Sequence, residues 1–199
     1  MAALVTACGS TSGTSAAPAT SPTPATSAAS ASASASAATA STAAAAPAAS
    51  PAQAGPPHCP TRSLQAKIGV SQGTAGSVYT VIVFTNISNV TCTLYGYPGV
   101  SFAGGSPVSQ IGLAATESNV TPRQLVTLAP HAVGNALLRI VDAGNFPAAK
   151  CHSVPAKFLQ IYPPNQTTPI LLSFNSQTCS KPVQILTISV VQPGAGSAS

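Results

Sequence analysis

The sequence has very few charged side chains. Its 199 residues include 7 Lys or Arg and 2 Asp or Glu, which is 5% of the chain, whereas an ordinary soluble domain has about 25%. Two carboxylates are too few for a carboxylate metal site, and they leave no spare acid beside a catalytic pair. Seven cations are too few for a nucleic-acid groove. We therefore expect no metal site, no cofactor, no nucleic-acid partner and no enzymatic activity.

The few charges are confined to one part of the chain. Residues 9–57 are Ala, Ser, Thr or Pro at 45 of 49 positions and carry no ionisable side chain. Ala is the best helix former, but Pro interrupts this segment repeatedly and no bulky apolar residue gives it a period. Such a segment cannot bury enough surface to offset its chain entropy. The sequence therefore predicts a disordered, low-complexity tether over 9–57, a folded domain over 58–192 and a flexible tail over 193–199.

The first eight residues resemble the end of a bacterial lipoprotein signal peptide. Val5 and Ala7 stand before Cys8 as the apolar and small residues of a lipobox do. A signal peptide has a positively charged start and about 7–15 apolar residues, so residues 1–8 are interpreted as a truncated one, with a start site further upstream. The alternative is a chance Cys in an Ala-rich segment. We expect a lipid on Cys8 to anchor the protein outside the bacterial cell membrane, or secretion if Cys8 carries none.

The other four cysteines predict two disulfides. An even number of cysteines in a small secreted domain is typical of disulfide bonding. Four cysteines allow three pairings, and we favour the one that joins neighbours in the sequence, Cys59 with Cys92 and Cys151 with Cys179. A zinc site is the poorer interpretation, because no two of these cysteines have the short spacing of zinc ligands.

The rest of the domain is patterned as short strands separated by turns. Val78–Thr85 is dense in β-branched and aromatic residues, and Val133–Val141 alternates well, as expected of strands. No ten-residue stretch has convincing helical amphipathicity, and residues 142–155 are predicted to be a long loop. The pattern predicts an all-β fold, an immunoglobulin-like antiparallel β-sandwich. The remaining predicted strands are Leu64–Val70, Val90–Tyr95, Val100–Ala103, Gln110–Ala114, Leu125–Leu128, Phe158–Tyr162, Ile170–Phe174 and Val183–Val191.

Residues with catalytic chemistry are sparse and scattered. Asp142 and His152 could join a serine in a hydrolase triad, which requires His to contact both partners. The stretch around Asp142 is more simply a turn, because Asp side chains bond to nearby backbone. His58 and His131 lie in predicted loops, and Glu117 lies in a polar one. We therefore predict no catalytic residue and no metal ligand.

Two turns that combine tyrosine with proline are the best candidates for a ligand site. Aromatic side chains of two such turns could line a shallow groove for a glycan or a peptide. The alternative is that they cap the sandwich and pack its corners. The predicted groove consists of Tyr95, Tyr97, Pro98, Tyr162 and Pro163.

Three stretches resemble an actinobacterial family of secreted lipoproteins, domain of unknown function 4232 (DUF4232). They are Tyr79–Gly99, Val126–Pro147 and Ile161–Ile170, and the similarity extends over almost the whole predicted domain. The resemblance implies an extracytoplasmic β-sandwich that often follows a lipobox and a tether. It implies no established activity and no defined binding residues.

The function expected from the sequence is therefore display of a binding domain. We expect a non-enzymatic cell-envelope lipoprotein, held to the membrane by its lipid, whose monomeric domain binds a cell-wall polymer or an envelope protein. A structural or accessory subunit of an envelope complex is the alternative, and a cell-wall hydrolase is a more distant one.

Overall fold

The computed structural model of the protein describes residues 55–198. The predicted lipid attachment site at Cys8 and nearly all of the predicted tether lie outside the described residues. Residues 55–198 form twelve strands and three short helical segments, so the all-β prediction is confirmed. No helix in this range is long and apolar enough to span a membrane.

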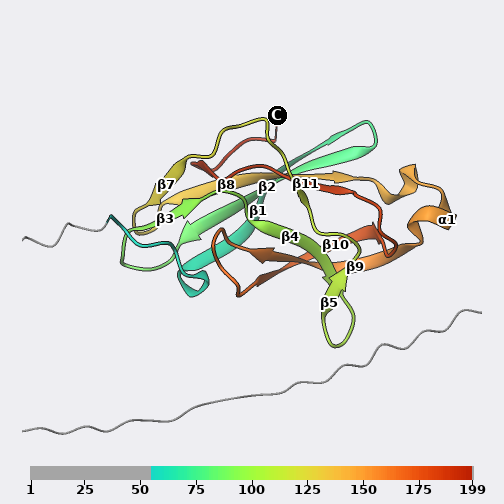
Figure 1. Ribbon diagram of the computed structural model, residues 1–199, viewed down its shortest axis with the longest axis horizontal. Coiled ribbons are helices and arrows are strands. Elements are labelled where there is room, and N and C mark those ends of the chain that lie inside the picture. Colours follow the sequence, from blue (N-terminus) through green and yellow to red (C-terminus); the bar gives the residue numbers. More distant parts are fainter. Residues whose placement is uncertain (1–54, 199) are drawn as a thin grey trace, which may run out of the picture. The chain divides into compact units, whose positions relative to one another are not determined.

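The larger sheet, called sheet I here, contains six strands in the order β1-β2-β8-β11-β6, with β12 also paired to β8. Its strands β1, β2, β8 and β11 are labelled in Figure 1. Its long strands are dense in β-branched residues, which fit a pleated surface. Its members are β1 (Leu64–Thr74), β2 (Ser77–Asn86), β6 (Thr116–Glu117), β8 (Val133–Val141), β11 (Leu186–Ile188) and β12 (Gln192–Pro193).

The second sheet, sheet II, has the order β10-β9-β4-β5, and a separate ribbon pairs β3 with β7. In β9 of sheet II, alternate side chains such as Leu159 and Ile161 face the core, as the period of a strand requires. The strands of sheet II are β4 (Gly99–Gly104), β5 (Ser109–Ile111), β9 (Ser153–Tyr162) and β10 (Ile170–Cys179), and those of the ribbon are β3 (Cys92–Tyr95) and β7 (Leu125–Leu128).

The strand order is immunoglobulin-like. In an immunoglobulin domain, strands A, B and E are neighbours in one sheet and strands C, F and G in the other. Here β1, β2 and β8 occupy the places of A, B and E, while β4, β9 and β10 occupy those of C, F and G. Strand β11, which follows β10 in the chain, lies beside β8 where strand D would lie.

One strand pair departs from the antiparallel pattern of the sandwich, because β6 and β11 run parallel. A tight hairpin forces neighbouring strands to be antiparallel. Strands β6 and β11 share no such turn, since residues 118–185 separate them along the chain. The parallel direction of β6 and β11 is therefore set by the path of the chain into each strand and not by a turn between them.

One apolar core joins the two sheets and the ribbon. Ile82 and Phe84 point inward from sheet I, and Phe102 and Leu159 point inward from sheet II, all with no exposed surface. Leu128 extends the same core into the ribbon. Burial of such side chains is worth roughly 1.5–3 kcal/mol each, so this core is the main source of stability in a domain with few charges.

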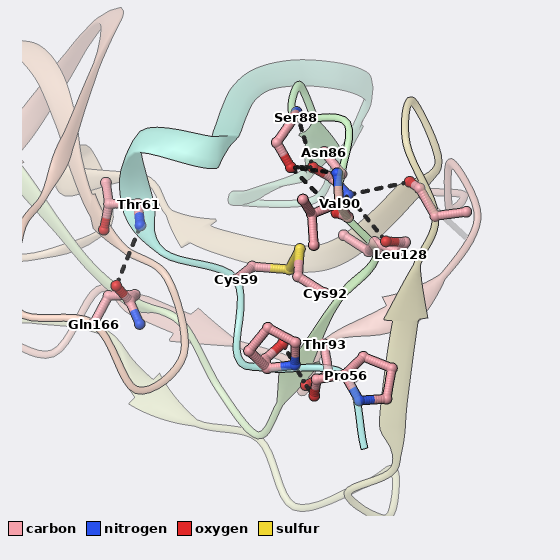
Figure 2. The surroundings of a disulfide bond; sticks show 12 residues. Pro56, Cys59, Thr61, Asn86, Ser88, Val90, Cys92, Thr93, Leu128 and Gln166 are labelled. Carbon is pink, nitrogen blue, oxygen red and sulfur yellow. Dashed lines mark hydrogen bonds between the residues drawn. A yellow bond between two sulfur atoms is a disulfide. The ribbon is translucent and has the colours of Figure 1, made fainter. Parts of the chain in front are cut away.

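The two predicted disulfides are confirmed. Cys59 is bonded to Cys92, with their Cα atoms 4.9 Å apart, and Cys151 is bonded to Cys179, with a Cα separation of 4.6 Å. The first ties the entry of the domain to β3 (Figure 2). The Cys59 amide also donates to the Thr93 carbonyl at 2.9 Å.

The stretch predicted as a loop over 142–155 contains regular structure. A 3₁₀ turn (η2) spans Ala143–Asn145, a single helical turn (α1) spans Ala148–Cys151, and β9 begins at Ser153. The Asp142 side chain caps η2 by accepting a hydrogen bond from the Gly144 amide at 2.8 Å. Only four residues form α1, too few to produce a helical period in the sequence.

The segment predicted as a flexible tail starts within a strand pair. Pro193 is paired with Gly134, and the Asn135 side-chain amide donates to the Gly194 carbonyl at 3.0 Å. The start of this segment is therefore anchored to β8.

Candidate functional site

The candidate site is built around Tyr97, just after β3. Gly96 precedes it with a φ of +96°, a conformation that glycine adopts readily because it has no Cβ. The Tyr97 ring is half-buried, and its hydroxyl lies 2.9 Å from the Ser118 carbonyl, to which it donates. The Asn119 side-chain oxygen lies 3.2 Å from the same hydroxyl. Tyr97 therefore fixes the loop that follows β6.

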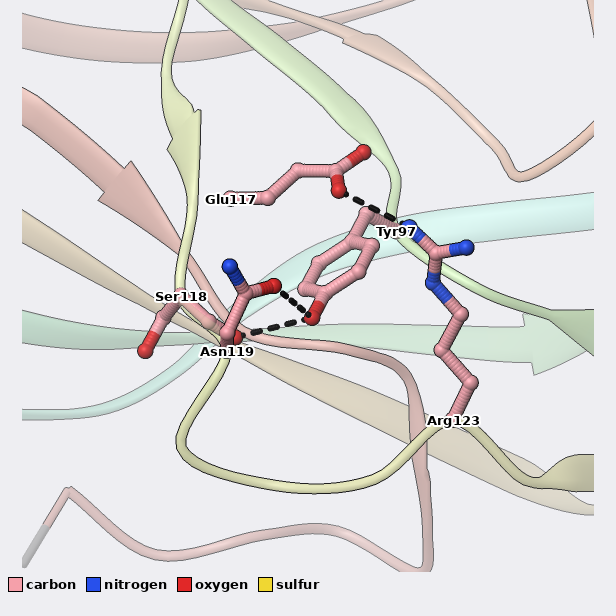
Figure 3. A network of polar contacts seen from close by, with 5 residues as sticks. All are labelled: Tyr97, Glu117, Ser118, Asn119 and Arg123. Carbon is pink, nitrogen blue, oxygen red and sulfur yellow. Dashed lines mark hydrogen bonds and ion pairs between the residues drawn. The ribbon is translucent and has the colours of Figure 1, made fainter.

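One of the two acids of the chain completes this site. Glu117 and Arg123 form an ion pair at 3.0 Å, and each side chain is 50% exposed. The Arg123 guanidinium also lies 5.0 Å from the centre of the Tyr97 ring, within the range of a cation–π interaction. An ion pair this exposed contributes about 0–1 kcal/mol, so it adds little to the stability of the fold. Figure 3 shows the three side chains together.

A pocket of about 240 Å³ lies against this network. Asn165, with a φ of +60°, comes from the second tyrosine–proline turn, between β9 and β10. The pocket therefore brings the two predicted turns together. It is lined by Tyr95, Gly96, Tyr97, Glu117, Arg123 and Asn165.

The other members of the predicted groove do not line this pocket. Pro98 and Pro163 are buried, which suits the packing role that was the alternative for these turns. Tyr162 is half-buried opposite Gly99, and its hydroxyl accepts a hydrogen bond from Gln160 at 2.7 Å.

An exposed apolar pair extends the site beyond the pocket. Tyr95 and Leu125 are cross-strand partners in the β3–β7 ribbon, with 44% and 61% of their surfaces exposed. Tyr95 also lines the pocket. The surface formed by Tyr95, Tyr97, Arg123 and Leu125, called the ribbon surface below, therefore combines apolar and aromatic side chains with an arginine that is ion-paired with Glu117.

Sequence reasoning missed Glu117, Arg123 and Asn165 as members of the site. Glu117 and Arg123 are six residues apart, and the chain between them follows no regular period. Their approach to Tyr97 depends on the pairing of β6 with β11, for which no local signal exists in the sequence.

The hypothetical hydrolase residues are only partly brought together. His152 Nδ1 lies 2.9 Å from Ser180 Oγ, beside the Cys151–Cys179 disulfide. Within residues 55–198, no hydrogen bond or ion pair joins His152 to Asp142, whose carboxylate instead caps η2. The His152–Ser180 pair is exposed to solvent, whereas a triad needs a buried acid that orients the histidine.

No metal site is found among the described residues. No three His, Cys, Asp or Glu side chains in this range are clustered as metal ligands. His58 and His131 are exposed, and His131 has a φ of +65° in the turn before β8.

One comparison with known proteins identifies a family for this chain. The sequence profile of the family described as "Domain of unknown function (DUF4232)" matches residues 59–192, a range that includes β1 to β11, both disulfides and the ribbon surface. A search of curated proteins gives no match. Because the profile covers the larger part of the chain, this protein belongs to the DUF4232 family.

Proposed function

We propose that this protein is a non-enzymatic lipoprotein of the bacterial cell envelope whose β-sandwich binds a partner through the ribbon surface. Two disulfides support an extracytoplasmic location, because such bonds persist in oxidising compartments. The lipobox-like residues before Cys8 support lipid anchoring, and the Ala/Ser/Thr/Pro composition of 9–57 suits a tether that holds the domain away from the membrane.

The observation that carries the proposal is the exposed Tyr95–Leu125 pair beside Arg123. Tyr and Arg are enriched among the residues that dominate binding energy at interfaces, and this domain otherwise has few charges. Tyr97 holds the neighbouring loop through Ser118, so the surface is ordered before a partner arrives. Such preorganisation lowers the entropic cost of binding.

The partner is a cell-wall polymer or an envelope protein. Co-sedimentation of the full chain with purified walls of the source bacterium, and crosslinking in its intact envelopes, distinguish the two. We expect Tyr95→Ser combined with Leu125→Ser to reduce retention at least fivefold. Leu171→Ser is the matched control, because Leu171 is 49% exposed on β10, in sheet II rather than in the ribbon. Equal loss in both variants, or no retention of the wild type in either assay, would refute this function.

Lipid anchoring is tested separately. Cells grown with radioactive palmitate should label the wild-type protein and not Cys8→Ser, and the substituted protein should leave the membrane fraction. Label on both proteins would show that Cys8 is not the attachment site.

An accessory subunit of an envelope complex is the second candidate. The same exposed Tyr95–Leu125 pair favours it, since a permanent partner would cover apolar surface. In that case the wild-type chain solubilised in mild detergent should elute with a stoichiometric protein partner, and the double variant should elute alone.

A further inference from the structure

A second candidate site lies on the outer face of sheet I. Side chains alternate along a strand, so β8 directs Leu138 and Ile140 into the core and Leu137 and Arg139 to the opposite face. Strands β2, β8 and β11 are neighbours in this sheet (Figure 1).

One row of side chains crosses this face over four strands. Tyr79 is opposite Gln72 on one side and opposite Arg139 on the other, and Arg139 is opposite Thr187. Directly paired residues point to the same face of a sheet. With strands about 4.8 Å apart, the row from Gln72 to Thr187 is about 14 Å long.

Two surface pockets that are open to solvent, called the two cavities below, adjoin this row, with volumes of about 450 Å³ and 420 Å³. Both are lined by Tyr79 and Leu137, so they share one floor. The loop after β6 contributes Ser118 and Thr121 to the larger cavity, and Ala198 contributes to the smaller one. Each volume lies within the range of small-molecule sites.

The lining has the chemistry of a saccharide site. Ser118, Thr121 and Thr187 line the larger cavity, and the hydroxyl of each can donate and accept a hydrogen bond. Tyr79 supplies an aromatic ring, and Leu137 supplies an apolar surface for the C–H face of a sugar. No acidic side chain lines either cavity.

Arg139 gives this face a positive charge. Its Nη2 donates to Ser77 Oγ at 3.2 Å, and its guanidinium lies 6.0 Å from the centre of the Tyr79 ring. No ion pair of Arg139 is present among residues 55–198, where Glu117 pairs with Arg123 and Asp142 caps η2. A guanidinium presents a planar set of donors that matches a carboxylate or phosphate.

We propose that the outer face of sheet I binds a saccharide that carries an anionic group, with Arg139 on the anion and Tyr79 and the hydroxyls on the sugar. This site is separate from the ribbon surface and does not depend on the proposed function. The loop from Ser118 to Arg123 contributes to both, because Ser118 and Thr121 line the larger cavity and Arg123 lies beside Tyr97 in the ribbon surface (Figure 3).

Two oligosaccharides of equal length provide the test. A hyaluronan hexasaccharide, which alternates glucuronate with N-acetylglucosamine, is titrated into the oxidised full chain, and neutral chitohexaose is titrated in parallel. Binding is followed by NMR shifts of the backbone amides of β2, β8 and β11. We expect the anionic sugar to bind at least about tenfold more tightly, the factor that one charge-assisted contact typically provides.

Charge-matched variants separate a site from general attraction to a basic protein. Arg139→Gln should weaken binding at least about tenfold. Lys67→Gln removes the same charge from exposed β1, opposite Val83 and outside both cavities, and should change affinity less than twofold. Thermal unfolding checks that both variants are folded.

Four results would each overturn the proposal: equal affinity for the neutral sugar, no effect of Arg139→Gln, equal losses in both variants, or no binding of the anionic hexasaccharide up to 10 mM. Shifts confined to the β3–β7 ribbon would also overturn it, because they would place the saccharide on the ribbon surface instead.

Discussion

Asn86 shows how a single polar residue can organise a corner of the domain. It is completely buried at the end of β2, and its Nδ2 donates to the Val90 carbonyl at 2.8 Å and to the Leu128 carbonyl at 3.0 Å. Its Oδ1 accepts from the Ser88 amide and hydroxyl, at 3.0 Å and 2.7 Å. One side chain thus joins β2, the following turn and β7 beside the first disulfide (Figure 2).

Asn86→Ala should lower the free energy of unfolding by about 3 kcal/mol, because it leaves the buried Leu128 carbonyl and the partly buried Val90 carbonyl without their donor. Denaturant unfolding of the oxidised chain measures this loss. Asn89→Ala is the control: Asn89 is exposed in the same turn, and its loss should cost less than about 0.5 kcal/mol. Equal losses for the two variants would show that the turn, rather than the buried network, carries the stability.

Strands with a clear local pattern could be predicted from the sequence, whereas short elements and contacts between distant parts of the chain could not. The alternation over Val133–Val141 and the run Leu125–Leu128 predicted β8 and β7 with the bounds that the structure has. Strand β6 and helix α1 went unpredicted, because two or four residues are too short to show a period. Only part of the site could be predicted. Tyr95 and Tyr97 stand out in the local sequence, whereas Arg123 reaches them only through tertiary contacts.

Gly112, just after β5, lies where the chain passes close to the end of β10. Its φ is +68°, and a Cβ added there would collide with the Cys179 carbonyl at the end of β10. Gly112→Ala should therefore destabilise the domain by about 2–4 kcal/mol, from left-handed backbone strain and displacement of that carbonyl.

Gly73→Ala is the matched control for Gly112→Ala. Gly73 lies in β1 with open space where its Cβ would be and has no positive φ, so the change should be within about 0.5 kcal/mol. Denaturant midpoints of the two variants measure the difference. A Gly112→Ala midpoint equal to that of Gly73→Ala would mean that residue 112 moves away from the Cys179 carbonyl without cost.

For the whole molecule, buried apolar side chains and disulfides, rather than ion pairs, are the main sources of folding stability. The described residues contain one ion pair, and it is half exposed. The two disulfides close loops with sequence separations of 33 and 28 residues. In the chain-entropy account each stabilises by about 3.6 kcal/mol, several times the contribution of such an ion pair. A sequence with few charged residues thus folds into a domain whose stability depends little on ion pairs.

The unfolding free energy of the oxidised chain should therefore be nearly independent of salt. Between 50 mM and 1 M NaCl we expect a change below about 0.5 kcal/mol, because the ion pair available for screening contributes so little. Reduction should instead remove several kcal/mol, since both loops open in the unfolded chain. Urea titrations of the Cys8→Ser chain at both salt concentrations, with and without dithiothreitol, measure the two effects with four cysteines left. A salt effect larger than the effect of reduction would show that charge, although scarce, dominates the stability of this domain.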